Sequence, residues 1–230
     1  MALVPVALAL MGQAAPAMDP DNPTCPKSLN FSDYKQMKFS KITRGGDDIL
    51  LAEGIIDKDV PDRLKKALDQ YPDVTEIWLR SPGGDARAGN AAGRAIRDSG
   101  RLLITRIPKG WACFSACNFV FMGGRARIVE PGGYFIVHMF TMTGARDAIA
   151  MSVEEGTDST IELIGSIEQE SALLASEDND FLIRMGVSRD LLTEVMYRQK
   201  AVKGADNDKS TRRCLTQDEA LKYNVANAAA

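Results

Sequence analysis

Short apolar runs alternate with amphipathic stretches over most of the chain. Five of these runs have the length and composition of buried strands, at residues 49–56, 76–80, 102–107, 126–129 and 134–139. Between them, residues 60–71 and 86–98 repeat small or apolar side chains at helical spacing, and Pro61 stands near the first turn of one of these stretches. Because strands alternate with helices, the pattern predicts an α/β fold with a parallel sheet and right-handed crossovers.

The C-terminal third has a different pattern. Helical periodicity runs over residues 160–185, and a second helix is expected over residues 188–199. Thr216 followed by Glu219 is a capping box that predicts one more short helix. The polar, charged stretch at residues 200–213 is expected to form a mobile loop.

Composition limits the classes of protein to consider. The chain has 230 residues, of which 45% are hydrophobic and 26% charged, so it is long enough for one sizeable core. Lys and Arg total 28 and Asp and Glu total 31, which leaves no cationic excess to hold a nucleic acid or an anionic membrane. Phosphate-loop, dinucleotide and zinc-protease motifs are absent from the sequence, and we predict neither a metal nor another cofactor.

The N-terminal residues resemble an export signal. Residues 2–11 are wholly apolar but span only about half of a bilayer-crossing helix, so no stable membrane span is expected. Ala15 and Ala17 give the small-x-small form of a signal-peptidase site, although no Lys or Arg precedes Lys27. We therefore predict three segments, a signal peptide (1–17), an N-terminal extension (18–47) and the main domain (48–227), in a periplasmic or secreted protein.

The four cysteines also fit an oxidising compartment. An even count allows two disulfides with three alternative pairings. We expect Cys25 to pair with Cys214, which would tie the two ends of the chain, and Cys113 to pair with Cys117. Zinc is not expected, because the Cys113-x-x-x-Cys117 spacing differs from that of a zinc knuckle.

Three features could carry chemistry, and each also has a purely structural explanation. Gly83 and Gly84 follow a strand, Ser115 precedes the short apolar helix expected at residues 116–122, and His138, the only histidine, ends another strand. The glycines could simply form a turn, the serine could cap its helix, and the histidine could be a buried neutral ring. Together they could instead supply backbone donors for an oxyanion, a nucleophile and a general base.

The order of these features resembles the proteolytic subunit of Clp-type proteases, within the Clp/crotonase superfamily. Residues 77–84 (IWLRSPGG) match the strand and Ser-Pro-Gly-Gly turn of that family, and Ser115 and His138 follow at close to family spacing. Residues 215–225 resemble its closing segment. The resemblance covers about residues 49–225, and it implies a spiral of βαβ units with C-terminal helices and assembly into a homo-oligomer.

The resemblance also implies a role for each matching residue. Ser115 would be the nucleophile, His138 the general base, and the N–H groups of Gly84 and Ala116 the oxyanion hole. The reaction would be acyl transfer from a peptide or protein substrate through an acyl-enzyme. The sequence thus predicts an exported serine hydrolase, specifically a peptidase of the Clp proteolytic-subunit type that works without an ATPase partner.

The sequence departs from the family pattern at two places. Cys113 and Cys117 flank the serine where small residues are common, and no aspartate falls within residues 191–196, where the family has the acid that orients the histidine. Glu194 is the substitute chosen here, with Asp190 as the other choice. Without either acid, the site would be a Ser-His dyad or an inactive relative.

Three alternatives compete with this hypothesis. The first is a non-catalytic binding protein on the same fold, in which Ser115 is a helix cap and His138 a core residue. The second is an enzyme with a lysine base, for which the candidates are Lys109, Lys200 and Lys203. The third is a thiol mechanism at Cys113 or Cys117, which an oxidising compartment disfavours.

Overall fold

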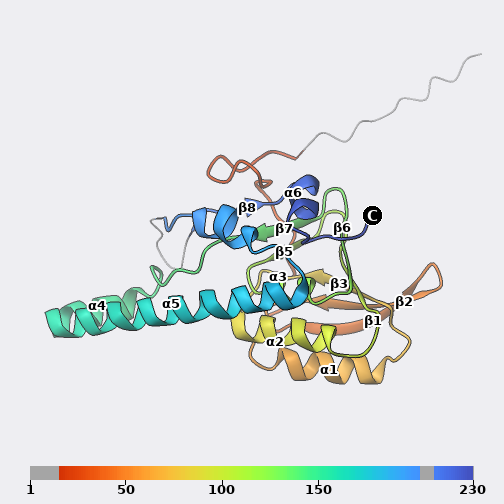
Figure 1. Cartoon of the computed structure of the whole chain (residues 1–230), viewed down its shortest axis with the longest axis horizontal. Coiled ribbons are helices and arrows are strands. Elements are labelled where there is room, and N and C mark those ends of the chain that lie inside the picture. Colours follow the sequence, from red (N-terminus) through yellow and green to blue (C-terminus); the bar gives the residue numbers. More distant parts are fainter. Residues whose placement is uncertain (1–15, 203–209, 230) are drawn as a thin grey trace, which may run out of the picture.

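The computed structural model describes residues 16–202 and 210–229 (Figure 1). The predicted signal peptide lies almost wholly outside these ranges, as does Lys203, one of the lysines considered as a base. None of the helices within the described ranges has the length and apolar character needed to cross a bilayer.

The larger sheet has five strands in the order β1-β2-β3-β4-β6. Its strands are β1 (Lys38–Arg44), β2 (Asp47–Glu53), β3 (Glu76–Arg80), β4 (Ile104–Ile107) and β6 (Ala126–Val129). All neighbours are parallel except β1 and β2, which form an antiparallel hairpin. The predicted parallel sheet is therefore present, and it begins in residues 18–47, the segment interpreted from sequence as an extension.

A smaller sheet lies beside it, with the order β5-β7-β8. Here β5 (Ala112–Phe114) and β7 (Tyr134–Val137) are parallel, and β8 (Arg213–Cys214) is antiparallel to β7. Residues 112–114 are not among the strands expected from the sequence. They form a strand because Ser81, just past β3, pairs with them: its N–H donates to Ala112 O at 3.0 Å and its carbonyl accepts from Phe114 N at 3.1 Å.

Three helices cover the core side of the larger sheet: α1 (Val60–Gln70), α2 (Ala86–Arg97) and α3 (Cys117–Met122). Two glycines of α2 allow this helix to pack closely against α3. A Cβ on Gly89 would lie 2.4 Å from Ala116 O, and one on Gly93 would lie 2.2 Å from Phe119 O. Because only glycine allows this approach, the start of α2 lies against the start of α3.

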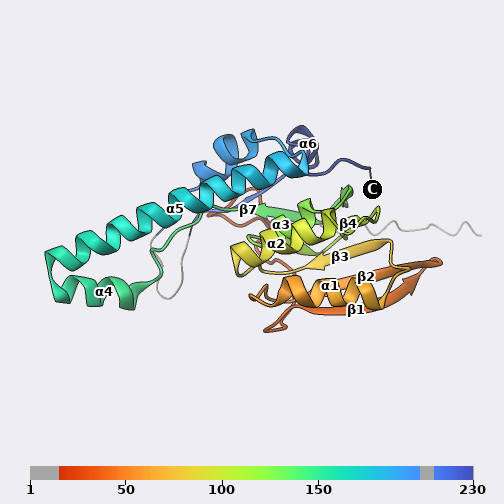
Figure 2. The same ribbon diagram turned by 60° about the horizontal axis from the view of Figure 1, so that its bottom comes forward.

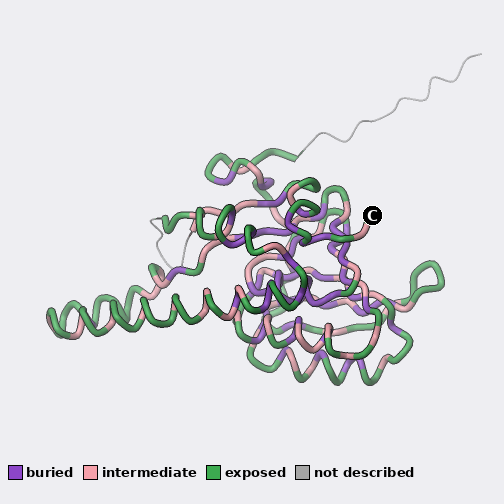
Figure 3. Tube along the Cα trace, in the orientation of Figure 1, coloured by how far each residue is buried: buried purple, intermediate pink, exposed green. Residues whose placement is uncertain are grey.

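A helical arm, formed by α4 (Arg146–Glu155) and α5 (Thr157–Met185), extends away from both sheets (Figures 1 and 2). The far part of the arm is mostly exposed, and only the C-terminal end of α5 joins the core (Figure 3). We had predicted α5 from residue 160 but did not predict α4. The α4 sequence has no apolar stripe of the kind that reveals a buried helix.

The C-terminal region agrees with the sequence in part. The capping box at α6 (Gln217–Lys222) is present, with Thr216 Oγ1 accepting from Glu219 N and the Glu219 carboxylate accepting from Thr216 N. The helix expected at residues 188–199 is instead a π-helical turn, η1 (Leu191–Val195), followed by a 3₁₀ turn, η2 (Met196–Arg198). The loop expected at residues 200–213 ends in strand β8, and its residues 203–209 lie outside the described ranges.

The structure joins the cysteines in the two pairs expected from sequence, Cys25 with Cys214 and Cys113 with Cys117. The first pair holds the N-terminal segment against β8. Two hydrogen bonds reinforce this contact, from Arg212 N to Asn22 Oδ1 at 2.5 Å and from Cys214 N to Thr24 Oγ1 at 3.1 Å.

Candidate active site

Ser115 occupies the tight turn between strand β5 and helix α3. Its φ of +56° is a left-handed conformation that few residues other than glycine adopt. Such a conformation costs about 1–3 kcal/mol and persists only where the surroundings enforce it. The turn therefore presents the serine hydroxyl at its tip, and the neighbouring chain holds it there.

Two contacts hold this turn. Gly83 packs so closely that a Cβ there would lie 2.6 Å from Phe114 O and 2.7 Å from Ser115 Cβ. On the other side, the Cys113–Cys117 disulfide links the middle of β5 to the first residue of α3 across a Cα–Cα distance of 5.3 Å. Both cysteines are fully buried. Ser115 is thus fixed between a glycine turn and a covalent crosslink.

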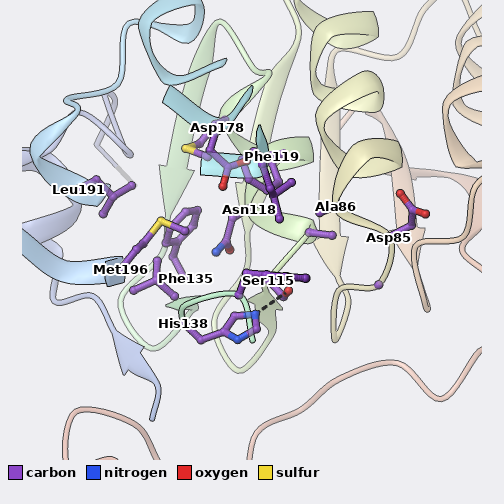
Figure 4. Close-up of a pocket in the computed structure, with 16 residues that line it drawn as sticks. Asp85, Ala86, Ser115, Asn118, Phe119, Phe135, His138, Asp178, Leu191 and Met196 are labelled. Atoms are coloured by element: carbon purple, nitrogen blue, oxygen red, sulfur yellow. Dashed lines mark hydrogen bonds between the residues drawn. The ribbon is translucent and has the colours of Figure 1, made fainter. Parts of the chain in front are cut away.

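His138 directly follows strand β7 and faces the serine. Its Nε2 lies 2.7 Å from Ser115 Oγ, as the dashed line in Figure 4 shows. The ring also packs against the Phe114 ring, with centroids 4.5 Å apart. A separation of this size allows the imidazole to take the hydroxyl proton directly.

The other ring nitrogen contacts a residue that sequence analysis missed. His138 Nδ1 lies 3.1 Å from Ser210 Oγ, which in turn lies 3.5 Å from Met139 O. The carbonyl can only accept, so the network assigns the order Nδ1–H to Ser210 and Ser210 O–H to Met139 O. Nε2 is then unprotonated and accepts from Ser115.

The two carboxylates considered as the third member are placed elsewhere. Glu194 accepts from Lys222 Nζ and Tyr223 OH, each at 2.8 Å, and these bonds hold its pKa below the ordinary carboxyl value. Asp190 borders a separate surface hollow. The π-helical turn directs Leu191 toward the site instead, so the structure brings Ser115 and His138 together but neither of these acids.

The alternative mechanisms named a lysine base or a cysteine thiol. Within the described residues, neither Lys109 nor Lys200 borders the cavity next to Ser115, and Lys203 is outside those residues. Cys113 and Cys117 are joined in a disulfide, so no thiolate is present at the turn. The described ranges also contain no cluster of three or more His, Cys, Asp or Glu side chains that could hold a metal ion.

Two backbone N–H groups next to Ser115 have free hydrogen-bonding capacity. Gly84 and Ala116, the residues expected to form an oxyanion hole, both border the same cavity as the serine. Among the hydrogen bonds of the described residues, neither N–H donates to a protein acceptor. A Cβ on Gly84 would lie 2.1 Å from Ile56 O, so only glycine permits this backbone position.

A cavity of about 300 Å³, the Ser115 cavity, opens beside the Ser115–His138 pair. Most of its wall is apolar and comes from α3, β7, α5, η1 and η2, through Phe119, Met122, Phe135, Leu174, Leu191 and Met196. Figure 4 labels four of these side chains around the space next to the serine, namely Phe119, Phe135, Leu191 and Met196. The cavity can therefore accept a side chain of a bound substrate.

Besides the exposed Asp85, which caps α2, two buried polar side chains interrupt the apolar wall, and sequence analysis found neither. Asn118 lies on α3 and Asp178 near the end of α5, and both are buried. Burial, together with the nearby charge of Glu177, raises the pKa of Asp178 to about 7. Asp178 shares a helix face with Phe181, Leu182 and Met185, and this periodicity was the signal available in the sequence.

The fold is that of an α/β protein of the Clp proteolytic-subunit type, as the sequence resemblance predicted. One solved structure with this fold is a ClpP1 mutant from Listeria monocytogenes, which is 15% identical in sequence. The match covers 79% of this chain and 90% of the other, with a TM-score of 0.52. No protein-family model matches the chain, and a search of curated proteins finds no match. At this identity the similarity shows the fold alone.

Proposed function

We propose that this protein is a serine hydrolase, specifically a peptidase of the Clp proteolytic-subunit type. One observation carries the proposal. His138 Nε2 lies 2.7 Å from Ser115 Oγ, at a strained strand-to-helix turn that borders a cavity. The Clp-like fold supports the same reaction class, and Ser115 and His138 are the residues to which the sequence resemblance assigns the roles of nucleophile and base.

The mechanism follows from the hydrogen bonds. His138 takes the Ser115 proton through Nε2 while Oγ attacks the substrate carbonyl carbon. The N–H groups of Gly84 and Ala116 donate to the resulting oxyanion. The imidazolium then gives its proton to the leaving amine, and a water molecule, activated by the same ring, releases the acyl group from Ser115. Ser210 accepts from Nδ1–H throughout and keeps the ring in the productive tautomer.

We propose that the protein acts in the periplasm or outside the cell, on a peptide or protein substrate and without an ATPase partner. Two disulfides support an oxidising compartment, and one of them spans the proposed nucleophile. The signal peptide and the homo-oligomer stay predictions from the sequence.

A fluorophosphonate probe tests the proposal, because it labels only an activated serine. We expect intact-mass spectrometry to detect one adduct on the folded wild-type protein and none on Ser115→Ala or His138→Ala. Heat-denatured wild-type protein is the control for unspecific reaction. Undiminished labelling of His138→Ala would favour a lysine base. Absence of labelling on the folded wild-type chain would instead favour a non-catalytic binding protein.

A further inference from the structure

The Ser115 cavity contains a buried hydrogen-bond acceptor without a partner. Asn118 is 3% exposed, and its Nδ2 donates to Ile136 O at 2.7 Å. A carbonyl can only accept, so the amide group that faces Ile136 O is the NH2 of Asn118, and Oδ1 is the group that faces the other way. Oδ1 has no hydrogen-bond partner in the described protein. Such orphaned acceptors are rare in native proteins and call for an explanation such as a ligand donor.

The second polar group is the Asp178 carboxyl. It is 7% exposed and, within residues 16–202 and 210–229, its interactions include neither an ion pair nor a hydrogen bond. The nearby titratable groups are the Glu177 carboxylate, which pairs with Arg87, and the Tyr197 hydroxyl. Burial and the charge of Asp178 raise the pKa of Tyr197 to about 12. The carboxyl thus faces no cation from the described protein.

The rest of the cavity wall is mostly apolar. The other lining residues include Phe119, Phe135 and Met196, all apolar. Figure 4 shows Asp178 on the side of the cavity away from the Ser115–His138 pair, with Asn118 between them. A side chain that enters beside the serine therefore packs against apolar walls and reaches the Asn118 amide before it reaches Asp178.

We propose, resting on the peptidase function, that this cavity binds the side chain of a lysine or arginine that directly precedes the scissile bond. The aliphatic stem packs against the apolar wall, and the cationic end pairs with Asp178 and donates to Asn118 Oδ1. Hydrolysis consumes one water, breaks the amide bond after the basic residue and yields a new carboxylate and a new amine. An acidic side chain is excluded by repulsion from Asp178, and a purely apolar one leaves both acceptors unpaired.

Four fluorogenic peptide amides that differ only in the residue before the scissile bond test this inference. That residue is lysine, arginine, norleucine or glutamate, and norleucine retains the lysine stem without its ammonium group. Fluorophosphonate titration of Ser115 gives the concentration of active sites. We expect kcat/KM for lysine and arginine to exceed that for norleucine at least tenfold, with glutamate lowest. Equal or faster cleavage after norleucine would overturn the inference.

A variant pair then assigns the preference to one carboxyl. Asp178→Asn should lower the lysine-to-norleucine ratio of kcat/KM at least tenfold. The matched control is Glu177→Gln, which makes the same chemical change at the preceding, more exposed residue of α5, and it should not lower the ratio, because the Glu177 charge opposes ionisation of Asp178. An unchanged ratio in a folded Asp178→Asn would contradict the assignment. If that variant does not fold, the wild-type peptide series still decides.

The outcomes also separate this inference from the function on which it rests. The probe reacts at Ser115 without needing a basic side chain in the cavity. Labelling of Ser115 without a preference for basic peptides would overturn the specificity and leave the hydrolase intact. Absence of labelling would overturn both.

Discussion

Replacement of Gly83 by alanine is the most direct test of how the serine is held. The added Cβ would lie 2.6 Å from Phe114 O and 2.7 Å from Ser115 Cβ, whereas an ordinary contact begins at 3.4 Å. The turn must therefore move by about 0.7 to 0.8 Å. A misplacement of about 1 Å costs roughly 100-fold in rate, so we expect Ser115 to react roughly 30-fold more slowly.

The assay is the rate of fluorophosphonate labelling of the folded variant. Gly46→Ala is the matched control, because Gly46 has a φ of +96° against +92° for Gly83 but lies in the β1–β2 hairpin with no atom within 4 Å of the added Cβ. Both variants lose about 1–3 kcal/mol of stability from backbone strain. Only Gly83→Ala displaces the serine, so only it should react slowly.

Two results would refute this reasoning. Equal labelling rates in the two alanine variants would mean that the contact with Gly83 does not position Ser115. A slow Gly46→Ala would mean that strain anywhere in the fold, rather than displacement of the turn, controls reactivity. Thermal unfolding of both variants shows whether they are folded under the assay conditions.

Three more predictions concern the crosslink, the histidine and the buried carboxyl. Replacing both Cys25 and Cys214 by serine should lower the free energy of unfolding by about 3–5 kcal/mol in urea titrations. The bond joins residues 189 positions apart and therefore restricts the unfolded chain. An unchanged free energy of unfolding would contradict this reasoning. Ser210→Ala should slow the labelling of Ser115 about tenfold, because the Ser210 hydroxyl orients the ring through His138 Nδ1. Ser210→Thr retains a hydroxyl and should restore the labelling rate. Burial raises the pKa of Asp178 from 3.8 to about 7, so the folded chain keeps a proton that the unfolded chain releases. The free energy of unfolding, measured relative to Asp178→Asn, should then fall from pH 4 to pH 7 and level off above; a rise would refute the shift.

The parts of the fold that the sequence revealed are those with strong local patterns. The alternation of apolar strands and amphipathic helices gave the parallel sheet, and Thr216 with Glu219 gave the last helix. Strand β5 was missed because three residues carry no periodicity, and its formation depends on pairing with Ser81 and with β7. Helix α4 was missed because most of it stays exposed and needs no apolar stripe.

The site residues that could be found from the sequence are likewise those that belong to a recognisable motif. Ser115 and His138 follow motifs with a fixed order and spacing, and the structure places them in contact. Glu194 was chosen by its place in the chain, but the side-chain direction depends on the local helix type, and the π-helical turn leads it to Lys222. Ser210 could not be found from sequence, because it comes near His138 only through the pairing of β8 with β7.

The crosslink between Cys25 and Cys214 has a consequence for the order of events during synthesis. Its two cysteines are 189 positions apart, so the N-terminal segment waits for its partner until those residues have been made. Strand β8 and Ser210, the partner of His138 Nδ1, belong to that same late segment. We therefore expect the sheet and helices α1 to α3 to assemble first and the histidine to be oriented last. Under the proposed function, a newly made chain would then carry its serine before the histidine is oriented to activate it.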